Sequence, residues 1–184
     1  MINLAIFLFV SAGLAILSIR SLRNRRSHGF YRFFAFESIL VLILLNVDAW
    51  FVHPFSPHQL VAWMLLCASL FLAIHGFVLL VHIGKPTGTL EGSSNLGIEN
   101  TTTLVKTGVY RLIRHPLYAS LVFGGWGVFF KDPSLLGAGL AVANSVFLTM
   151  TAKVEEKENL KKFGDEYKEY MKSTHMFIPN VFTI

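Results

Sequence analysis

The sequence predicts an all-α, polytopic integral membrane protein that forms one domain with about five transmembrane helices. Of the 184 residues, 53% are hydrophobic, and the mean hydropathy is +0.55. The apolar residues fall in long runs, and the charged residues gather between those runs instead of spreading as they do on a water-soluble surface. Several runs approach the roughly 20 residues that a helix needs to cross a hydrocarbon core of about 30 Å.

Three apolar runs make up the first part of the chain. They cover residues 2–19, 33–52 and 60–83, and each predicts one membrane helix. No basic residue precedes the first run and no small-residue cleavage site follows it, so we expect a retained helix and not a signal peptide. Two prolines in residues 53–59 predict a turn between the second and third helices.

Two shorter apolar runs follow a polar loop at residues 84–105. They cover residues 116–130 and 135–150, which is about 23 Å of helix each, and predict a short helical hairpin. Close packing within this hairpin is expected from the small residues Gly124, Gly125, Gly127, Gly137, Gly139, Ala141 and Ala143. The Lys- and Glu-rich stretch from Thr151 to about Ser173 predicts a cytosolic helical tail along the membrane surface, with a break at Gly164.

The basic residues predict the orientation. Placing the amino terminus outside leaves Lys131 as the only one of the 16 Lys and Arg residues on the outer side. The carboxyl terminus is then cytosolic. This orientation fits a plasma membrane in a prokaryote or an endoplasmic reticulum in a eukaryote, with the lipid bilayer as the main partner.

Several other classes are disfavoured by the composition. A net charge of +5 comes without the basic, aromatic-rich face of a nucleic-acid-binding domain. Cys67 lies alone in an apolar run, so we expect a small buried hydrophobe and neither a disulfide nor a zinc ligand. His75 and His82 are seven residues apart without an evident carboxylate partner, so no metal is expected. No Gly-rich fingerprint follows a predicted strand, which argues against a Rossmann cofactor domain.

Ligand-binding side chains gather on the predicted inner side, just before the fourth helix. Arg114 and His115 can donate hydrogen bonds to a carboxylate or a ribose, and Tyr110 and Tyr118 offer ring faces to a cation. Pro116 is suited to the first turn of a helix. The alternative is an interfacial belt that only anchors a helix end.

Glu155 and Glu156 lie just past the fifth helix on the same side. A carboxylate there can hold a cationic cofactor or accept a proton, and we take Glu156 and Arg114 as candidate catalytic residues. The alternative is solvation beside neighbouring lysines. Glu37, one turn inside the second helix, is a further candidate because an unpaired intramembrane carboxylate is costly, although pairing with Arg32 or Arg114 would explain it.

Two linked motifs carry a resemblance to a known family. One is the segment 108–118, which contains Arg114-His115-Pro116-Leu117-Tyr118, and the other runs from Glu155-Glu156 through Phe163-Gly164 to Phe177-Ile178-Pro179. Together they resemble the isoprenylcysteine carboxyl methyltransferases, a family related to phospholipid N-methyltransferases. The resemblance covers about residues 100–180.

The resemblance implies an enzyme that uses S-adenosylmethionine and methylates a lipophilic or prenylated substrate. It divides the chain into three membrane helices at residues 1–83 and a cofactor-binding, catalytic half at residues 84–184. It implies no metal and no nucleic acid. The cofactor-binding residues that it implies are Thr102, Thr103, Leu104, Val105, Tyr110, His115, Pro116, Leu117, Tyr118 and Glu155, with Glu156 beside them.

One departure from the family concerns the substrate. Thr151 stands where members that methylate a prenylcysteine carboxylate carry an arginine, and threonine cannot pair with a carboxylate in that way. A lipid amine is therefore an alternative substrate, as in phospholipid N-methyltransferases. A membrane reductase that uses NADPH and a membrane protein without enzymatic activity are also compatible with the sequence.

Overall fold

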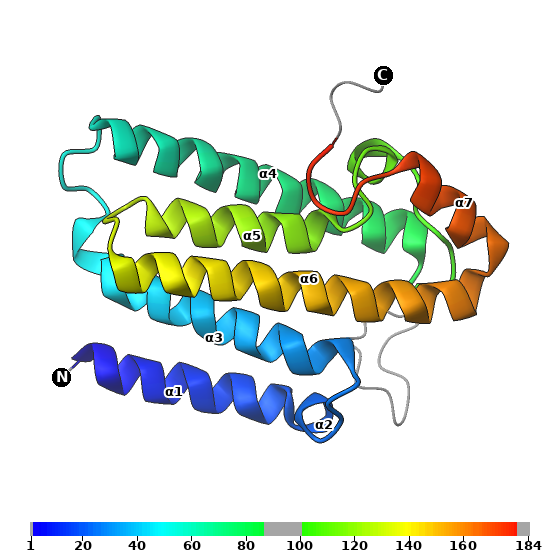
Figure 1. Ribbon diagram of the computed structural model, residues 1–184, viewed down its shortest axis with the longest axis horizontal. Helices are drawn as coiled ribbons and strands as arrows, with labels where there is room; N and C mark the ends of the chain where they lie inside the picture. The colour runs from blue at the N-terminus through cyan, green and yellow to red at the C-terminus, as the bar shows by residue number, and fades with distance from the viewer. Residues whose placement is uncertain (1, 87–100, 180–184) are drawn as a thin grey trace.

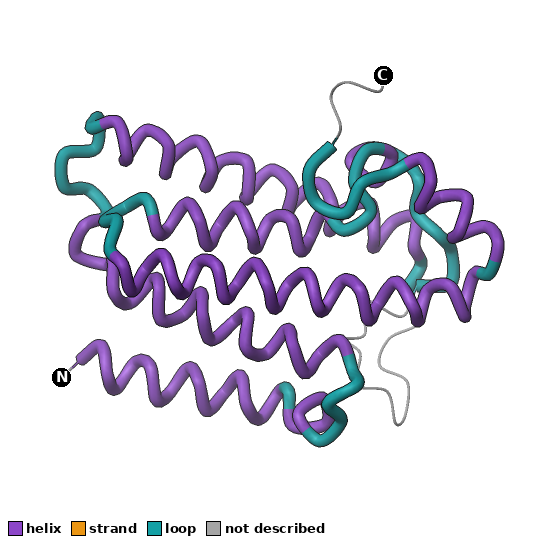
Figure 2. Tube along the Cα trace, in the orientation of Figure 1, coloured by secondary structure: helices purple, strands orange, loops and turns teal. Residues whose placement is uncertain are grey.

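The computed structural model describes residues 2–86 and 101–179, and within them all regular secondary structure is helical (Figures 1 and 2). Most of the predicted polar loop, residues 87–100, lies outside the described part. The helices are α1 (Ile2–Leu17), α2 (Ile19–Leu22), α3 (His28–Asn46), η1 (Val47–Ala49), α4 (Pro57–Gly84), η3 (Gly108–Arg111), α5 (Pro116–Phe129), α6 (Leu135–Phe163) and α7 (Asp165–Ser173).

The five apolar helices form a bundle of roughly parallel rods (Figure 1). α5 lies between α4 and α6, α3 packs against α6, and α1 lies outermost against α3. Figure 1 places α2 and α7 at one end of the bundle, which we call the pocket end, and η1 at the opposite end. No residue of α1 is buried, as expected for an apolar helix that faces lipid.

Within the described residues, three helices are long and apolar enough to cross a membrane: His28–Ala49, Pro57–Gly84 and Leu135–Phe163. α1 and α5 are apolar but shorter. The five predicted runs therefore all form helices, and the protein has the composition of a membrane protein. Five crossings and the orientation of the chain stay predictions.

The structure corrects two expectations about the second half of the chain. Of the two helices in the predicted short hairpin, only α5 is short. α6 is one continuous helix of 29 residues. The first part of the predicted surface tail extends α6 beyond the apolar core, and only α7 turns away from it (Figure 1). The predicted break at Gly164 is confirmed by a φ of +56°, a conformation that glycine adopts without strain.

The small residues pack partly as predicted, since Gly125 lies against α6 and Gly137 against Phe129 of α5, whereas Gly127 packs on α4. A Cβ on Gly127 would lie 2.9 Å from Leu66 Cγ of α4, and one on Gly125 would lie 3.3 Å from the Asn144 amide of α6. Gly139 faces open space, so the prediction that it packs in the hairpin is wrong. Cys67 is exposed on α4 and not buried as expected, because the close α4–α5 contact uses a different face of this helix.

A lysine closes the end of the bundle opposite the pocket. Lys131 is 1% exposed, its Nζ lies 3.1 Å from the centroid of the Trp63 ring, and it donates a hydrogen bond of 3.0 Å to Gln59 Oε1. Burial lowers the pKa of Lys131, while the ring face of Trp63 favours its charged form. This contact ties the start of α4 to the α5–α6 loop.

Candidate functional site

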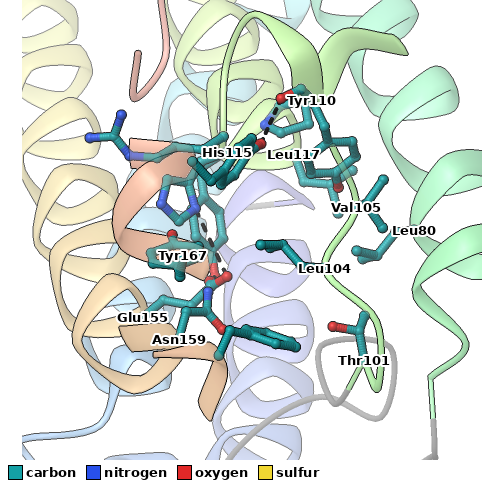
Figure 3. Close-up of a pocket in the computed structure, with 15 residues that line it drawn as sticks. Leu80, Thr101, Leu104, Val105, Tyr110, His115, Leu117, Glu155, Asn159 and Tyr167 are labelled. Atoms are coloured by element: carbon teal, nitrogen blue, oxygen red, sulfur yellow. Dashed lines mark hydrogen bonds and ion pairs between the residues drawn. The ribbon is translucent and has the colours of Figure 1, made fainter. Parts of the chain in front are cut away.

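A pocket lies at the pocket end, between α4, the segment before α5, α6 and α7 (Figure 3). Its cavity volume is about 80 Å³. Its lining consists of Leu80, Thr101, Leu104, Val105, Tyr110, Arg114, His115, Pro116, Leu117, Tyr118, Glu155, Asn159, Phe163, Tyr167 and Tyr170.

One wall of the pocket is a stripe along α6. Glu155, Asn159 and Phe163 follow one another at intervals of four residues, so they share one helix face. The extension of α6 beyond its apolar part is what carries this stripe to the pocket. A tail lying along the membrane surface from Thr151 onward would not place it there.

The facing wall comes from the start of α5. Pro116 occupies the first turn of α5, as predicted, and the helix begins immediately after His115. The His115 ring stacks on Tyr118 with centroids 5.5 Å apart. The Tyr118 hydroxyl donates a hydrogen bond of 2.5 Å to Glu155 Oε2, so the α5 and α6 walls are joined directly beside the pocket.

Aromatic rings dominate the rest of the lining. Tyr170 donates a hydrogen bond of 2.6 Å to the carbonyl of Tyr110, which connects α7 to η3. Burial raises the pKa of Tyr110, Tyr167 and Tyr170, so these phenols are neutral at physiological pH. The walls therefore offer neutral ring faces, with Glu155 as the acidic group among them.

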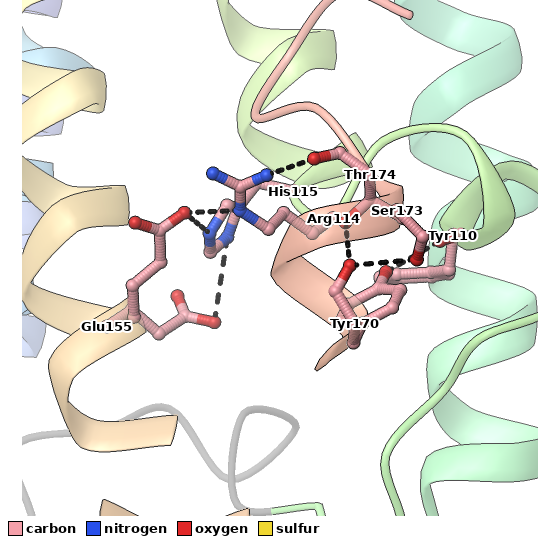
Figure 4. A network of polar contacts seen from close by, with 8 residues as sticks. Tyr110, Arg114, His115, Glu155, Tyr170, Ser173 and Thr174 are labelled. Carbon is pink, nitrogen blue, oxygen red and sulfur yellow. Dashed lines mark hydrogen bonds and ion pairs between the residues drawn. The ribbon is translucent and has the colours of Figure 1, made fainter. Parts of the chain in front are cut away.

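Arg114 lines the pocket but its charge is already compensated (Figure 4). Its Nε donates to Glu156 Oε1 at 2.5 Å, and the two side chains are only 12% and 10% exposed. A second guanidinium nitrogen donates to the carbonyl of Thr174. The positive charge of Arg114 is therefore directed to Glu156 and the tail, and not to a ligand in the pocket.

His115 faces α6, where both of its ring nitrogens lie near carboxylates (Figure 4). Its Nδ1 is 3.9 Å from Glu155 Oε1, and its Nε2 is 3.4 Å from Glu156 Oε1. The Nε2 contact is close enough for electrostatic attraction but lacks the geometry of a hydrogen bond, so this buried nitrogen has no hydrogen-bond partner among the described residues. The imidazole thus lies against the Tyr118 ring and close to both carboxylates.

The tail after α7 returns along the segment before α5. The amide of Arg114 donates to the His175 carbonyl at 2.9 Å, and the amide of His115 donates to the Met176 carbonyl at 3.2 Å. Phe177 packs edge-on against the His115 ring. The two motifs that are distant in the sequence therefore form one structural unit.

The structure brings most of the candidate site residues together, but not all. Thr102 and Thr103 are exposed outside the pocket lining, and the Thr102 hydroxyl donates to the Lys85 carbonyl. Glu156 is buried outside the lining, against Arg114. The other predicted residues that line the pocket are Leu104, Val105, Tyr110, Arg114, His115, Pro116, Leu117, Tyr118 and Glu155.

Some lining residues were not among the candidates. They are Leu80, Thr101, Asn159, Phe163, Tyr167 and Tyr170. The four-residue spacing from Glu155 could have indicated Asn159 and Phe163 once α6 was recognised as continuous. Leu80 and Thr101 carry no such signal, because they reach the pocket only through the packing of α4.

Glu37 and His75, two candidates from the sequence, lie outside the pocket lining. Glu37 accepts a hydrogen bond of 2.9 Å from Ser11 of α1, whereas Arg114, one of its two proposed partners, binds Glu156. The His75 ring stacks on Phe71, a packing role. Across residues 2–86 and 101–179, no three His, Cys, Asp or Glu side chains lie close enough to hold a metal ion.

Thr151 is also accounted for by local structure. It is fully buried, and its hydroxyl donates to the Phe147 carbonyl one turn earlier in α6 at 2.8 Å. The side chain is therefore satisfied within its own helix. It offers no contact to a ligand in the pocket.

The structure is thus an apolar helical bundle, with the composition of a membrane protein and a polar, aromatic pocket at one end. The chain belongs to the phospholipid methyltransferase family, whose model matches residues 58–166, more than half of the chain. This match confirms the resemblance to membrane methyltransferases. It covers nearly all of α4 and the whole of α5 and α6, but not α1 to α3.

Curated relatives of the chain are bacterial methyltransferases. It is 28% identical over 120 residues to methanethiol S-methyltransferase 1 of Bradyrhizobium diazoefficiens, covering 64% of this chain and 38% of that protein. It is 23% identical over 73 residues to methanethiol S-methyltransferase of Pseudomonas deceptionensis, covering 40% of this chain and 27% of that protein. The chain thus spans less than two fifths of the length of these relatives. No solved structure matches it.

Proposed function

We propose that this protein is an S-adenosylmethionine-dependent methyltransferase that acts on a lipophilic substrate. The observation that carries the proposal is the charge balance of the pocket. Glu155 faces a space walled by neutral aromatic rings, while the charge of Arg114 is directed to Glu156. Such a site suits a cation that is attracted by ring faces and a carboxylate, which describes the sulfonium of S-adenosylmethionine. Membership of the family supports the same chemistry.

The residues of the chain have separate roles in this proposal. The methyl donor supplies an electrophilic methyl group, and the protein binds and orients it and excludes water. Glu155, Tyr110 and Tyr118 hold the cationic part, while Leu104, Val105, His115, Pro116 and Leu117 shape the walls. Thr102 and Thr103 are exposed between the lining residues Thr101 and Leu104. Arg114 and Glu156 act as a pair that keeps His115 and the tail in place around the reacting groups.

The site favours a nucleophile without a permanent negative charge. Arg114 is paired with Glu156, so no cation in the described lining is free to hold a carboxylate. Thr151 is hydrogen-bonded within α6 and does not replace the missing arginine. A thiol or an amine therefore fits better than the carboxylate of a prenylated cysteine. The relatives named methanethiol S-methyltransferases favour the thiol, and the phospholipid methyltransferase family favours a lipid amine as second candidate.

The proposal is tested by calorimetric titration of the detergent-purified protein with S-adenosylhomocysteine. A His115→Ala, Tyr118→Ala variant serves as control, and NADPH is titrated in parallel. We expect saturable binding of S-adenosylhomocysteine that the control loses. Binding of NADPH alone would point to a reductase, and binding of neither by a folded sample would contradict an enzymatic role for the pocket.

Once binding in the methyl-donor pocket is confirmed, candidate substrates can be screened directly. Transfer of a labelled methyl group would be compared for a short-chain thiol, a phosphatidylethanolamine and a prenylcysteine. We expect transfer to the thiol or the amine and not to the prenylcysteine carboxylate. Exclusive carboxylate methylation would contradict our interpretation of Thr151.

A further inference from the structure

A histidine in the first half of the chain reaches the helix that carries the pocket stripe. His28 is the first residue of α3, and it is fully buried. Its Nδ1 lies 2.9 Å from Glu158 Oε2 on α6, across 130 positions of sequence. A carboxylate can only accept, so the imidazole nitrogen donates this hydrogen bond. His28 is also outside residues 58–166, the part of the chain that matches the family.

Glu158 connects α3 to the part of α6 that lines the pocket. It lies one helical turn beyond Glu155 and directly before Asn159, both of which line the pocket. α6 is a continuous helix across this turn, so the three side chains have a fixed angular spacing around its axis. A contact that holds Glu158 therefore also sets the rotation and the height of Glu155 and Asn159.

Several polar contacts of this turn come from the second half of the chain. Tyr118 holds Glu155, Arg114 holds Glu156, and Lys162 donates to the carbonyl of Thr101. These contacts join α6 to the elements around the pocket. The His28 contact comes from α3, so the same part of α6 is bound to both halves of the chain.

The backbone that presents His28 is itself fixed. Ser27 caps α3, and its hydroxyl accepts a hydrogen bond of 3.1 Å from the Gly29 amide. A Cβ on Gly29 would lie 2.4 Å from Ser21 Oγ, so only glycine permits α2 to pack this closely. The histidine thus projects from a capped helix start that is braced by α2.

We propose that His28 is a positioning residue for the methyl-donor site, acting through Glu158 on Glu155 and Asn159. The inference rests on the proposed function, because its consequence is the affinity of the pocket for the donor. The family match does not include His28, and the proposal gives this part of the chain a role in ligand binding. The contact joins two side chains, so a double-mutant cycle can isolate it.

The test is the affinity for S-adenosylhomocysteine, measured by calorimetry on the 184-residue chain. Glu158→Ala removes the acceptor from a side chain that is 40% exposed, so this variant is expected to fold. We expect it to weaken binding about three- to tenfold, and the His28→Ala, Glu158→Ala double variant to lose no more than the larger single loss. Lys157→Ala, exposed on the adjacent position of α6, is the matched control and should bind like the wild type.

A rescue variant separates positioning from general stability. His28→Asn retains a donor near the place of Nδ1, so it should bind S-adenosylhomocysteine more tightly than His28→Ala at equal thermal stability. Wild-type affinity in Glu158→Ala, or losses that simply add in the double variant, would overturn the role of His28. Failure of the wild type itself to bind would instead overturn the proposed function.

Discussion

Glu155 is the residue whose charge matters most to the proposed function. It lies among aromatic side chains, receives a hydrogen bond from Tyr118, and is 24% exposed, so its carboxylate is partly shielded from water. Electrostatic attraction is stronger in such a place than in bulk solvent. The carboxylate should therefore distinguish a cationic ligand from a neutral one of almost the same shape.

Replacing Glu155 with Gln tests this at constant size. S-Adenosylmethionine carries a sulfonium charge that S-adenosylhomocysteine lacks, so the variant should lose about tenfold more affinity for the former than for the latter. Calorimetry with both ligands measures the difference. Glu169→Gln, on the exposed face of α7, serves as control. Equal losses for both ligands would show that Glu155 does not contact the charge.

The Arg114–Glu156 pair should matter for stability as much as for function. Removing one member of a buried ion pair leaves the other charge uncompensated, which costs about 3 kcal/mol, whereas removing both costs much less. We expect Arg114→Met to lower the free energy of unfolding by about that amount. The Arg114→Met, Glu156→Met double variant should recover most of it. Denaturant titration in mixed micelles measures both, and a double variant as unstable as the single one would contradict the prediction.

At the level of helices, the α4–α5 contact depends on the absence of a side chain at Gly127. A Cβ there would lie 2.9 Å from Leu66 Cγ and 3.2 Å from the Leu66 backbone nitrogen, and the backbone atom cannot move aside without shifting α4. The contact matters to the site because α4 supplies Leu80 to the pocket and the Gly76 carbonyl to the Tyr110 hydroxyl.

Alanine at Gly127 should therefore destabilise the protein by about 1–3 kcal/mol through overpacking. The matched change is Gly139→Ala on α6, where a Cβ meets nothing within 4 Å. This control should be neutral or slightly stabilising, because alanine is the better helix former by up to about 1 kcal/mol. Thermal unfolding of the two variants in the same detergent makes the comparison. Similar losses for both would mean that α4 and α5 do not pack as described.

For the whole molecule, the two ends of the bundle should face opposite sides of the membrane. The pocket end carries the arginines around α2 and the lysines of the tail, and the other end carries Lys131. The positive-inside rule then places the pocket on the cytosolic side. A water-soluble methyl donor would enter there, while a lipophilic substrate would arrive from the bilayer.

Cysteine labelling tests this orientation. In a Cys67→Ala background, Asp132→Cys lies at one end of α6 and Lys157→Cys at the other, and both positions are exposed. An impermeant maleimide added to intact spheroplasts should label position 132, and position 157 only after permeabilisation. The reverse pattern would invert the topology. Labelling of both before permeabilisation would show that α6 does not cross the membrane.

The amino-acid sequence is enough to predict the helical class, the five apolar runs, the break at Gly164 and a turn from residue 53, although α4 already begins at Pro57. These features depend on local composition and on hydropathy over the length of a membrane, so they can be recognised without knowing how the helices pack. The motif around Arg114 and the Glu155-Glu156 pair also indicated the site. Their residue types are costly near a membrane unless they have partners or a function.

Tertiary packing decided the rest. It made α6 continuous, which brought Asn159 and Phe163 into the pocket, and it paired Arg114 with Glu156 instead of leaving either free for a ligand. It also brought His28 to Glu158 across 130 positions. Such contacts depend on which helix faces lie against each other, and hydropathy cannot specify this because helix faces that meet lipid and faces that meet protein are similarly apolar.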